Sequence, residues 1–232
     1  MKTRTTTTKR HDWLVSWCQV GWLYAMYAIG VLMLCWLLVD WQDMQAAQRI
    51  AFVMAIALPA HVFEEDSAPS GFFYANNLSM GSKDPYVYPQ NEATNMFTNL
   101  AAEVLFVVLA FVSPHWAYPV ITLAATFGIA EAFMHTLKGA QTLPKLRAGG
   151  KTTIYDPGIL TAYVILLPLS CVAIKWMTER TFDAAGFWWG IGLMLLVVVG
   201  FILVPFAINM RVRSKRFAFH DAAYYDRFIG KH

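Results

Sequence analysis

Six ionisable side chains lie within stretches of sequence that are otherwise apolar, where a charge is costly to bury. They are two imidazoles and four carboxylates: His61, Glu64, Glu65, Glu103, Glu131 and His135. A single Asp, Lys or Arg at the centre of a membrane helix costs at least about 2.5 kcal/mol on insertion scales. Imidazole and carboxylate groups are ligands of iron, manganese and zinc, and they also transfer protons in acid–base catalysis. Six such groups therefore indicate a functional site.

The spacing of five of these residues puts them on shared helix faces. Glu64 and Glu65 follow His61 by three and four residues. His135 follows Glu131 by four residues. Because side chains three or four residues apart are neighbours on the surface of a helix, each group shares one face. Two helices, and a third that carries the remaining carboxylate, can therefore each turn a polar face toward a common point.

The composition is typical of a membrane protein. Hydrophobic residues make up 57% of the 232 residues and charged residues only 14%, whereas a soluble domain carries about 25% charged residues. A helix that crosses a bilayer needs about 20 apolar residues. Six stretches meet or approach this length, so we predict an all-α fold: one integral membrane domain over residues 1–232 with six transmembrane helices. The predicted spans are 19–39, 47–65, 97–113, 117–136, 158–176 and 186–209.

Lysine and arginine are distributed unevenly between the two ends of the predicted spans. Fifteen of the 18 lie in the two tails and in the connections 66–96 and 137–157, and three lie in the other connections. By the positive-inside rule, this asymmetry predicts that both termini are cytoplasmic. The same orientation places all six ionisable groups in one layer near the cytoplasmic end of the bundle.

The ligand types favour a metal centre. Carboxylate-rich helix bundles with two histidines are typical of di-iron and di-manganese sites, and we expect one or two ions of iron, manganese or zinc. The predicted metal ligands are His61, Glu64, Glu103, Glu131 and His135. The predicted catalytic residues are Glu65, as a bridging ligand, an orienting partner or a general base, and Tyr155, which could orient a substrate head group or a carboxylate. Asp156 and Pro157 are explained as the ordinary start of a helix.

These residues favour a metal-dependent membrane enzyme that acts on a hydrophobic, lipid-like substrate from the cytoplasmic leaflet. The number of carboxylates slightly favours di-iron oxidation over zinc-type hydrolysis. Two alternatives stay open. A Glu and His pair could transfer a proton in a metal-free isomerase, and chains of Glu and His within the membrane also form the proton relays of transporters.

Membrane lipids and a hydrophobic small molecule are the expected partners. The basic segment 211–216 is expected to bind anionic lipid head groups. The sequence contains no Walker A motif and no G-x-G-x-x-G motif, the glycine-rich patterns that bind phosphates of nucleotides. We therefore expect no nucleic-acid partner.

The run His61-Val62-Phe63-Glu64-Glu65 resembles the defining motif of the HXXEE-motif family of bacterial integral membrane proteins. The spacing from Glu131 to His135 and the segment 155–158 are also similar to that family's pattern, and the resemblance covers roughly residues 45–175. It implies that the His and the two Glu of the motif are defining positions, and that the protein lies in a bacterial inner membrane. The family has no settled activity, so the resemblance implies no reaction. A more distant likeness is to emopamil-binding-type sterol isomerases, which transfer protons without a metal.

Overall fold

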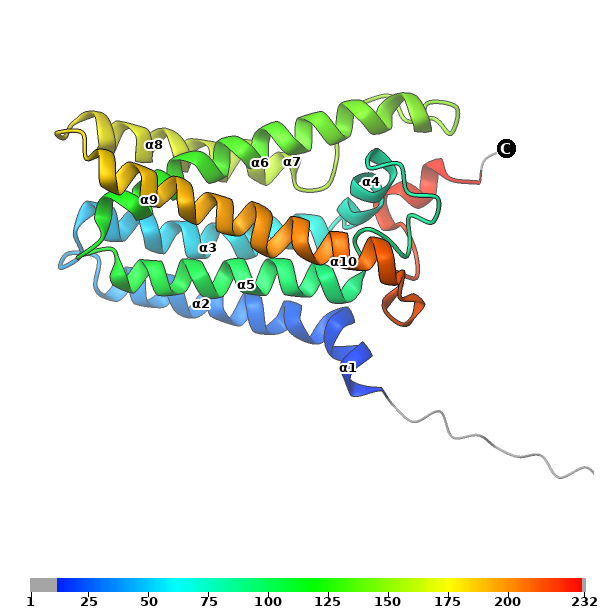
Figure 1. Ribbon diagram of the computed structural model, residues 1–232, viewed down its shortest axis with the longest axis horizontal. Helices are drawn as coiled ribbons and strands as arrows, with labels where there is room; N and C mark the ends of the chain where they lie inside the picture. Colours follow the sequence, from blue (N-terminus) through cyan, green and yellow to red (C-terminus); the bar gives the residue numbers. More distant parts are fainter. Residues whose placement is uncertain (1–11, 231–232) are drawn as a thin grey trace, which may run out of the picture.

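The computed structural model describes residues 12–230, and within these residues the only regular secondary structure is helical (Figure 1). Six helical segments are long and apolar enough to cross a membrane. The first three are Trp13–Val39, built from α1 (Trp13–Ser16), η1 (Trp17–Gly21) and α2 (Trp22–Val39), then α3 (Ala46–Asp66) and α5 (Glu92–Val112). The others are α6 (Ala117–Leu146), Ile159–Thr178, built from α7 (Ile159–Thr161), η2 (Ala162–Leu166) and α8 (Leu167–Thr178), and Ala184–Val212, built from α9 (Ala184–Leu195), η3 (Leu196–Leu203) and α10 (Val204–Val212). The all-α fold with six candidate membrane spans is confirmed.

The spans run side by side as a bundle, with α3 and α6 its most buried members (Figure 1). α3 packs against α2, α5 and α6, and α6 packs against α8 and α9. The core between them is apolar and aromatic, and Phe106 and Phe127 meet there edge to face at 5.0 Å between ring centroids. Gly128 permits a close approach of α6 to η2, because a Cβ at this position would overlap the backbone carbonyl of Leu166. Large apolar side chains such as Leu38 and Trp188 face outward, as the lipid-facing surface of a bundle requires.

One end of the bundle carries a folded cap, which consists of residues 67–91, 147–158 and 214–230 (Figure 1). It contains α4 (Phe72–Ser79) and two short 3₁₀ helices, η4 (Lys215–Phe217) and η5 (Ala223–Phe228). The cap has its own small core, formed by Phe73, Tyr74, Ala75, Ala222 and Tyr225 together with Leu146 at the end of α6. Both described ends of the chain lie at this end of the bundle, as an even number of spans requires.

Three spans extend well past their predicted bounds, and the first of them begins at Trp13 instead of position 19. α5 begins at Glu92 because Asn91 and Thr94 form a capping box, in which each side chain accepts from the other's backbone N–H at 2.9 Å. α6 continues to Leu146, well beyond position 136, although its last turns contain Lys138 and Lys145. Hydropathy falls there because the helix leaves the apolar layer, and its burial is then provided by the cap. The basic C-terminal segment also contacts protein: Arg216 pairs with Asp12 at 2.8 Å.

Candidate metal centre

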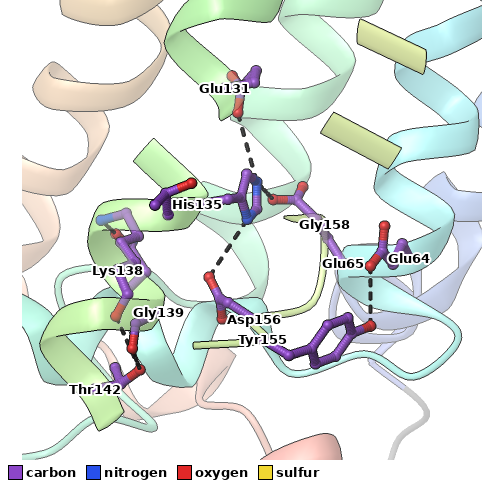
Figure 2. A network of polar contacts seen from close by, with 12 residues as sticks. Glu64, Glu65, Glu131, His135, Lys138, Gly139, Thr142, Tyr155, Asp156 and Gly158 are labelled. Carbon is purple, nitrogen blue, oxygen red and sulfur yellow. Dashed lines mark hydrogen bonds and ion pairs between the residues drawn. The ribbon is translucent and has the colours of Figure 1, made fainter. Parts of the chain in front are cut away.

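Two histidines from different spans point their Nε2 atoms at each other. Nε2 of His61 on α3 and Nε2 of His135 on α6 are 3.2 Å apart. Oε1 of Glu65 lies 3.6 Å from the first and 3.2 Å from the second of these nitrogens. All three side chains are buried, and their ligand atoms are close enough together to hold one metal ion. Figure 2 shows Glu65, Glu131 and Asp156 arranged around the ring of His135.

The separations fit a single ion. At a zinc–nitrogen distance of about 2.0–2.1 Å, two nitrogens 3.2 Å apart subtend an angle of about 100–106° at the ion. This angle lies between those of octahedral and tetrahedral coordination. Two imidazoles and one carboxylate are the protein ligands of many catalytic zinc sites, which keep a fourth position open. The same set with open positions also binds Fe(II) in non-haem oxygenases.

Hydrogen bonds fix which nitrogen of His61 faces the centre. The hydroxyl of Thr161 donates to Oε2 of Glu64 at 2.6 Å, so its oxygen accepts from Nδ1 of His61 at 2.9 Å. A neutral imidazole that carries its proton on Nδ1 has a free lone pair on Nε2. His61 is therefore held in the form that binds a metal, by a carboxylate that acts through Thr161.

His135 faces a buried carboxylate of the cap, as an ion pair and without a hydrogen bond to it. Its Nδ1 lies 3.4 Å from Oδ2 of Asp156, whose other oxygen accepts from the hydroxyl of Tyr225 at 2.6 Å. Burial raises the pKa of Asp156 above its usual range, although the contact with His135 acts in the opposite direction. Burial and the charge of Asp156 raise the pKa of Tyr225, which therefore stays protonated and donates. Carboxylates that orient metal-binding histidines are common and increase the basicity of the ring.

Glu64 lies apart from the centre and is a hydrogen-bond acceptor for the start of α7. It accepts from the backbone N–H groups of Leu160 at 3.2 Å and Thr161 at 2.7 Å. Its Oε1 also accepts from the hydroxyl of Tyr155 at 3.0 Å. Burial and the charge of Glu64 raise the pKa of Tyr155, so that this phenol stays a donor. The predicted ligand Glu64 and the predicted catalytic Tyr155 thus form one hydrogen-bonded unit that supports His61.

Glu131 and Glu103 occupy different environments. Oε2 of Glu131 lies 3.7 Å from Nε2 of both histidines, and the side chain remains 23% exposed. Glu103 is fully buried in α5 and forms no ion pair with any described residue. Neither of its carboxyl oxygens has a hydrogen-bond partner in the described part of the chain. The structure therefore brings Glu131 to the edge of the centre and leaves Glu103 outside it.

A cavity of about 270 Å³ reaches the centre. His61, Glu65 and Glu131 line its polar end. Its other walls come from α5, α6 and η3 and include the buried apolar residues Phe127 and Val197. η3 is a π-helix, a distortion that often occurs at functional sites. A small molecule in this cavity would have direct access to the metal ligands.

Three residues of the site were not predicted from their positions in the sequence. Asp156 was interpreted as part of a helix start, but its side chain contacts His135 and Tyr225 instead. Tyr225 lies in a tail that carries no recognisable pattern. Lys138 lines the cavity, and its position three residues after His135 on the same helix face was the signal that could have identified it.

Gly158 lies against the ring of His135, and this contact gives a testable prediction. Its φ is +99°, and a Cβ at this position would overlap the imidazole. Gly158→Ala should displace the ring and lower metal affinity at least about tenfold, as expected for a change that misorients a ligand. Gly150→Ala is the matched control, because Gly150 has a φ of +98° and open space around its Cβ position. Metal affinity is measured by equilibrium dialysis. If both variants lost the same affinity, backbone strain alone would explain the effect, and the contact with the His135 ring would not.

The chain was compared with known protein families, curated proteins and solved structures. A sequence model of a family described as a protein of unknown function with an HXXEE motif matches residues 50–173. This region includes the three clustered side chains, Glu131 and Asp156, and it ends before the C-terminal part of the cap. A search of curated proteins and a search of solved structures gave no match.

Proposed function

Because the chain belongs to the family of proteins with an HXXEE motif, whose function is unknown, we propose a function from its site. The protein is a membrane enzyme that uses one divalent metal ion, with zinc favoured over iron and manganese, to hydrolyse a hydrophobic, lipid-like substrate. His61, His135 and Glu65 bind the ion, and Glu131 is the general base. The observation that supports this proposal is the position of Glu131 beside a two-histidine, one-carboxylate set.

The arrangement favours hydrolysis over di-iron oxidation. A di-iron centre needs more carboxylates than the cluster contains, since Glu64 is engaged by α7 and Glu103 lies elsewhere. A bound divalent ion polarises a carbonyl and increases the acidity of water. Glu131 lines the cavity with a partly exposed carboxylate, as a base that accepts a proton from water must do.

The reaction can be written for an ester. The oxygen of water adds to the carbonyl carbon, and the carboxylate of Glu131 accepts the proton that water releases. The carbon–oxygen bond to the alcohol then breaks, and the same proton passes from Glu131 to the leaving oxygen. The two histidines stay in place, because the hydroxyl of Thr161 is hydrogen-bonded to His61 and the carboxylate of Asp156 forms an ion pair with His135.

The walls of the cavity favour a lipid-like substrate. Met80, Met134 and Leu203 line the cavity and are also 39–47% exposed on the surface of the protein. An apolar molecule can therefore enter sideways between α6 and the last span without crossing water. The excess of Lys and Arg in the tails and in the connections at this end of the bundle favours a cytoplasmic location for the site.

The proposal is tested by incubating the purified protein with liposomes of defined ester lipids in oxygen-18 water. We expect oxygen-18 to enter the released acid only when metal is present. Glu131→Gln should lower the rate at least about a hundredfold with metal content unchanged, since general bases contribute about 10²–10⁴-fold. His115→Ala, in the turn at the opposite end of the bundle, is the control and should retain activity. Turnover that persists after complete removal of the metal would exclude the proposal and favour metal-free proton transfer.

A further inference from the structure

Lys138 is a buried cation in the wall of the cavity. It follows His135 by three residues on α6 and is only 8% exposed. Its ammonium donates one hydrogen bond, to Oδ1 of Asn76, and lies 6.0 Å from the centre of the Phe72 ring. Within residues 12–230, no carboxylate lies within 4.0 Å of this ammonium. Burying a charge without a direct partner is costly, so the position of Lys138 calls for an explanation.

A chain of buried amides connects Lys138 to a distant acid. Asn76 donates to Gln90 at 2.7 Å, and Gln90 donates to Asn95 at 2.7 Å. Asn95 then donates to Oδ1 of Asp66 at 2.8 Å. Every hydrogen bond in this chain runs in the same direction, from the ammonium to the carboxylate. The chain fixes the amides in place and keeps Asp66 away from Lys138, so that the ammonium can still bind a second acceptor.

The charges around Lys138 leave room for an anionic ligand once a divalent ion is bound at the centre. The acids whose charges act on it are Asp156, Glu131 and Glu65, which surround the metal centre. A divalent ion bound at that centre would offset two of these negative charges, and Lys138 has two donor hydrogens that no described residue accepts. Lys138 and the centre line the same cavity, so one molecule can contact both.

We propose that the cavity binds an amphiphile whose anionic head group, a phosphate or a carboxylate, pairs with Lys138, while its chain lies along the apolar wall. This inference rests on the proposed function and names its substrate class. The head group would lie next to the amide chain, and the bond to be hydrolysed would face Glu131. The apolar wall includes Ala102, Phe127 and Val197.

Binding of radiolabelled decyl phosphate to the immobilised full-length protein in a neutral detergent tests this proposal, with metal-free and zinc-loaded samples in parallel. We expect saturable binding of decyl phosphate. Decanoate should displace it, whereas decanol and inorganic phosphate should displace it at least about tenfold less well. Lys138→Gln should weaken binding at least about tenfold, because hydrogen bonds to charged groups are the strongest class. Lys138→Arg should retain most of the affinity. Lys145→Gln is the control, because Lys145 lies on the same helix but is exposed and donates to the carbonyl of Leu78.

Each outcome has a distinct meaning. Equal displacement by decanol and decyl phosphate, or wild-type affinity in Lys138→Gln, would overturn the anionic head group. If inorganic phosphate displaced decyl phosphate as well as decanoate does, the ligand would be a free anion, and the proposed role of the apolar wall would be refuted. The competition among ligands uses the wild-type protein, so it holds even if a variant fails to fold. If the protein takes up no metal but still binds decyl phosphate in a way that depends on Lys138, the anion site is supported and the proposed metal centre is refuted. If the protein takes up metal but does not prefer anionic amphiphiles, only the proposed substrate class is refuted.

Discussion

Replacing His135 by alanine should abolish stoichiometric metal binding. Its Nε2 lies 3.2 Å from Nε2 of His61 and 3.2 Å from the carboxylate of Glu65, so the change removes the one ligand next to both others. Loss of a residue that only orients a ligand costs about 10–100-fold in affinity, and loss of the ligand itself should cost more than about a hundredfold. Zinc equilibrium dialysis followed by elemental analysis measures this directly.

Two further variants serve as an intermediate case and a negative control for His135→Ala. Asp156→Asn keeps the shape of the side chain but weakens its hold on Nδ1 of His135, and we expect an affinity loss of about 10–100-fold. His115→Ala removes a histidine from the opposite end of the bundle and should leave affinity unchanged. If His135→Ala bound zinc as tightly as the wild type, the histidines would not be ligands.

Replacing Glu64 by leucine should strongly destabilise the protein. Its carboxylate accepts four hydrogen bonds: from the backbone N–H groups of Leu160 and Thr161, and from the hydroxyls of Thr161 and Tyr155. Leucine removes the acceptor of these partly buried donors, and each group left unsatisfied costs about 1–3 kcal/mol. We expect the free energy of unfolding to fall by about 3 kcal/mol or more. For a chain of this size, this corresponds to a melting temperature lower by about 6–12 °C, measured in a mild detergent.

Glu103→Gln is the matched control for Glu64→Leu. Glu103 is also a buried glutamate in a membrane span, but neither of its oxygens has a hydrogen-bond partner among the described residues. Removing its ionisable group should leave the melting temperature unchanged or raise it, because no hydrogen bond to a described residue is lost. A larger decrease in melting temperature for Glu103→Gln than for Glu64→Leu would contradict the roles that we assign to the two residues.

The fold was largely predictable from the sequence because hydropathy and length decide which segments span a membrane. The ends of the helices were less predictable. α6 continues past position 136 because the cap buries its polar last turns, and the apolar residues of that cap, such as Phe73 and Tyr225, are far apart in the sequence. Local hydropathy cannot report burial by a distant segment.

The site was predictable only in part. The helical spacing correctly placed His61 with Glu65 and Glu131 with His135, and the structure brings these four side chains together. Spacing could not separate Glu64 from Glu65, because both lie near the face of the motif histidine, about 100° apart around the helix. The difference comes from the N-terminus of α7, 97 residues further along the chain, which engages Glu64.

The supporting groups of the histidines depend on contacts that no local pattern reveals. The hydroxyl of Tyr225 reaches Asp156 across 69 residues of sequence, and Thr161 reaches His61 across 100. Glu103 was predicted to join the other acids because its helix could turn a polar face toward the same point, yet it has no ion pair or hydrogen bond with any described residue. Helical spacing identifies residues that share a face, and tertiary packing decides which faces meet.

The most direct test of the central claim is the metal content and coordination of the purified full-length protein. Elemental analysis combined with X-ray absorption at the metal edge should find one ion per chain, with two imidazole nitrogens and oxygen donors among its neighbours. His61→Ala and Glu65→Ala should each lose the ion. A wild-type protein that remains free of metal after exposure to zinc, iron and manganese, or an ion that is retained in both variants, would contradict the account.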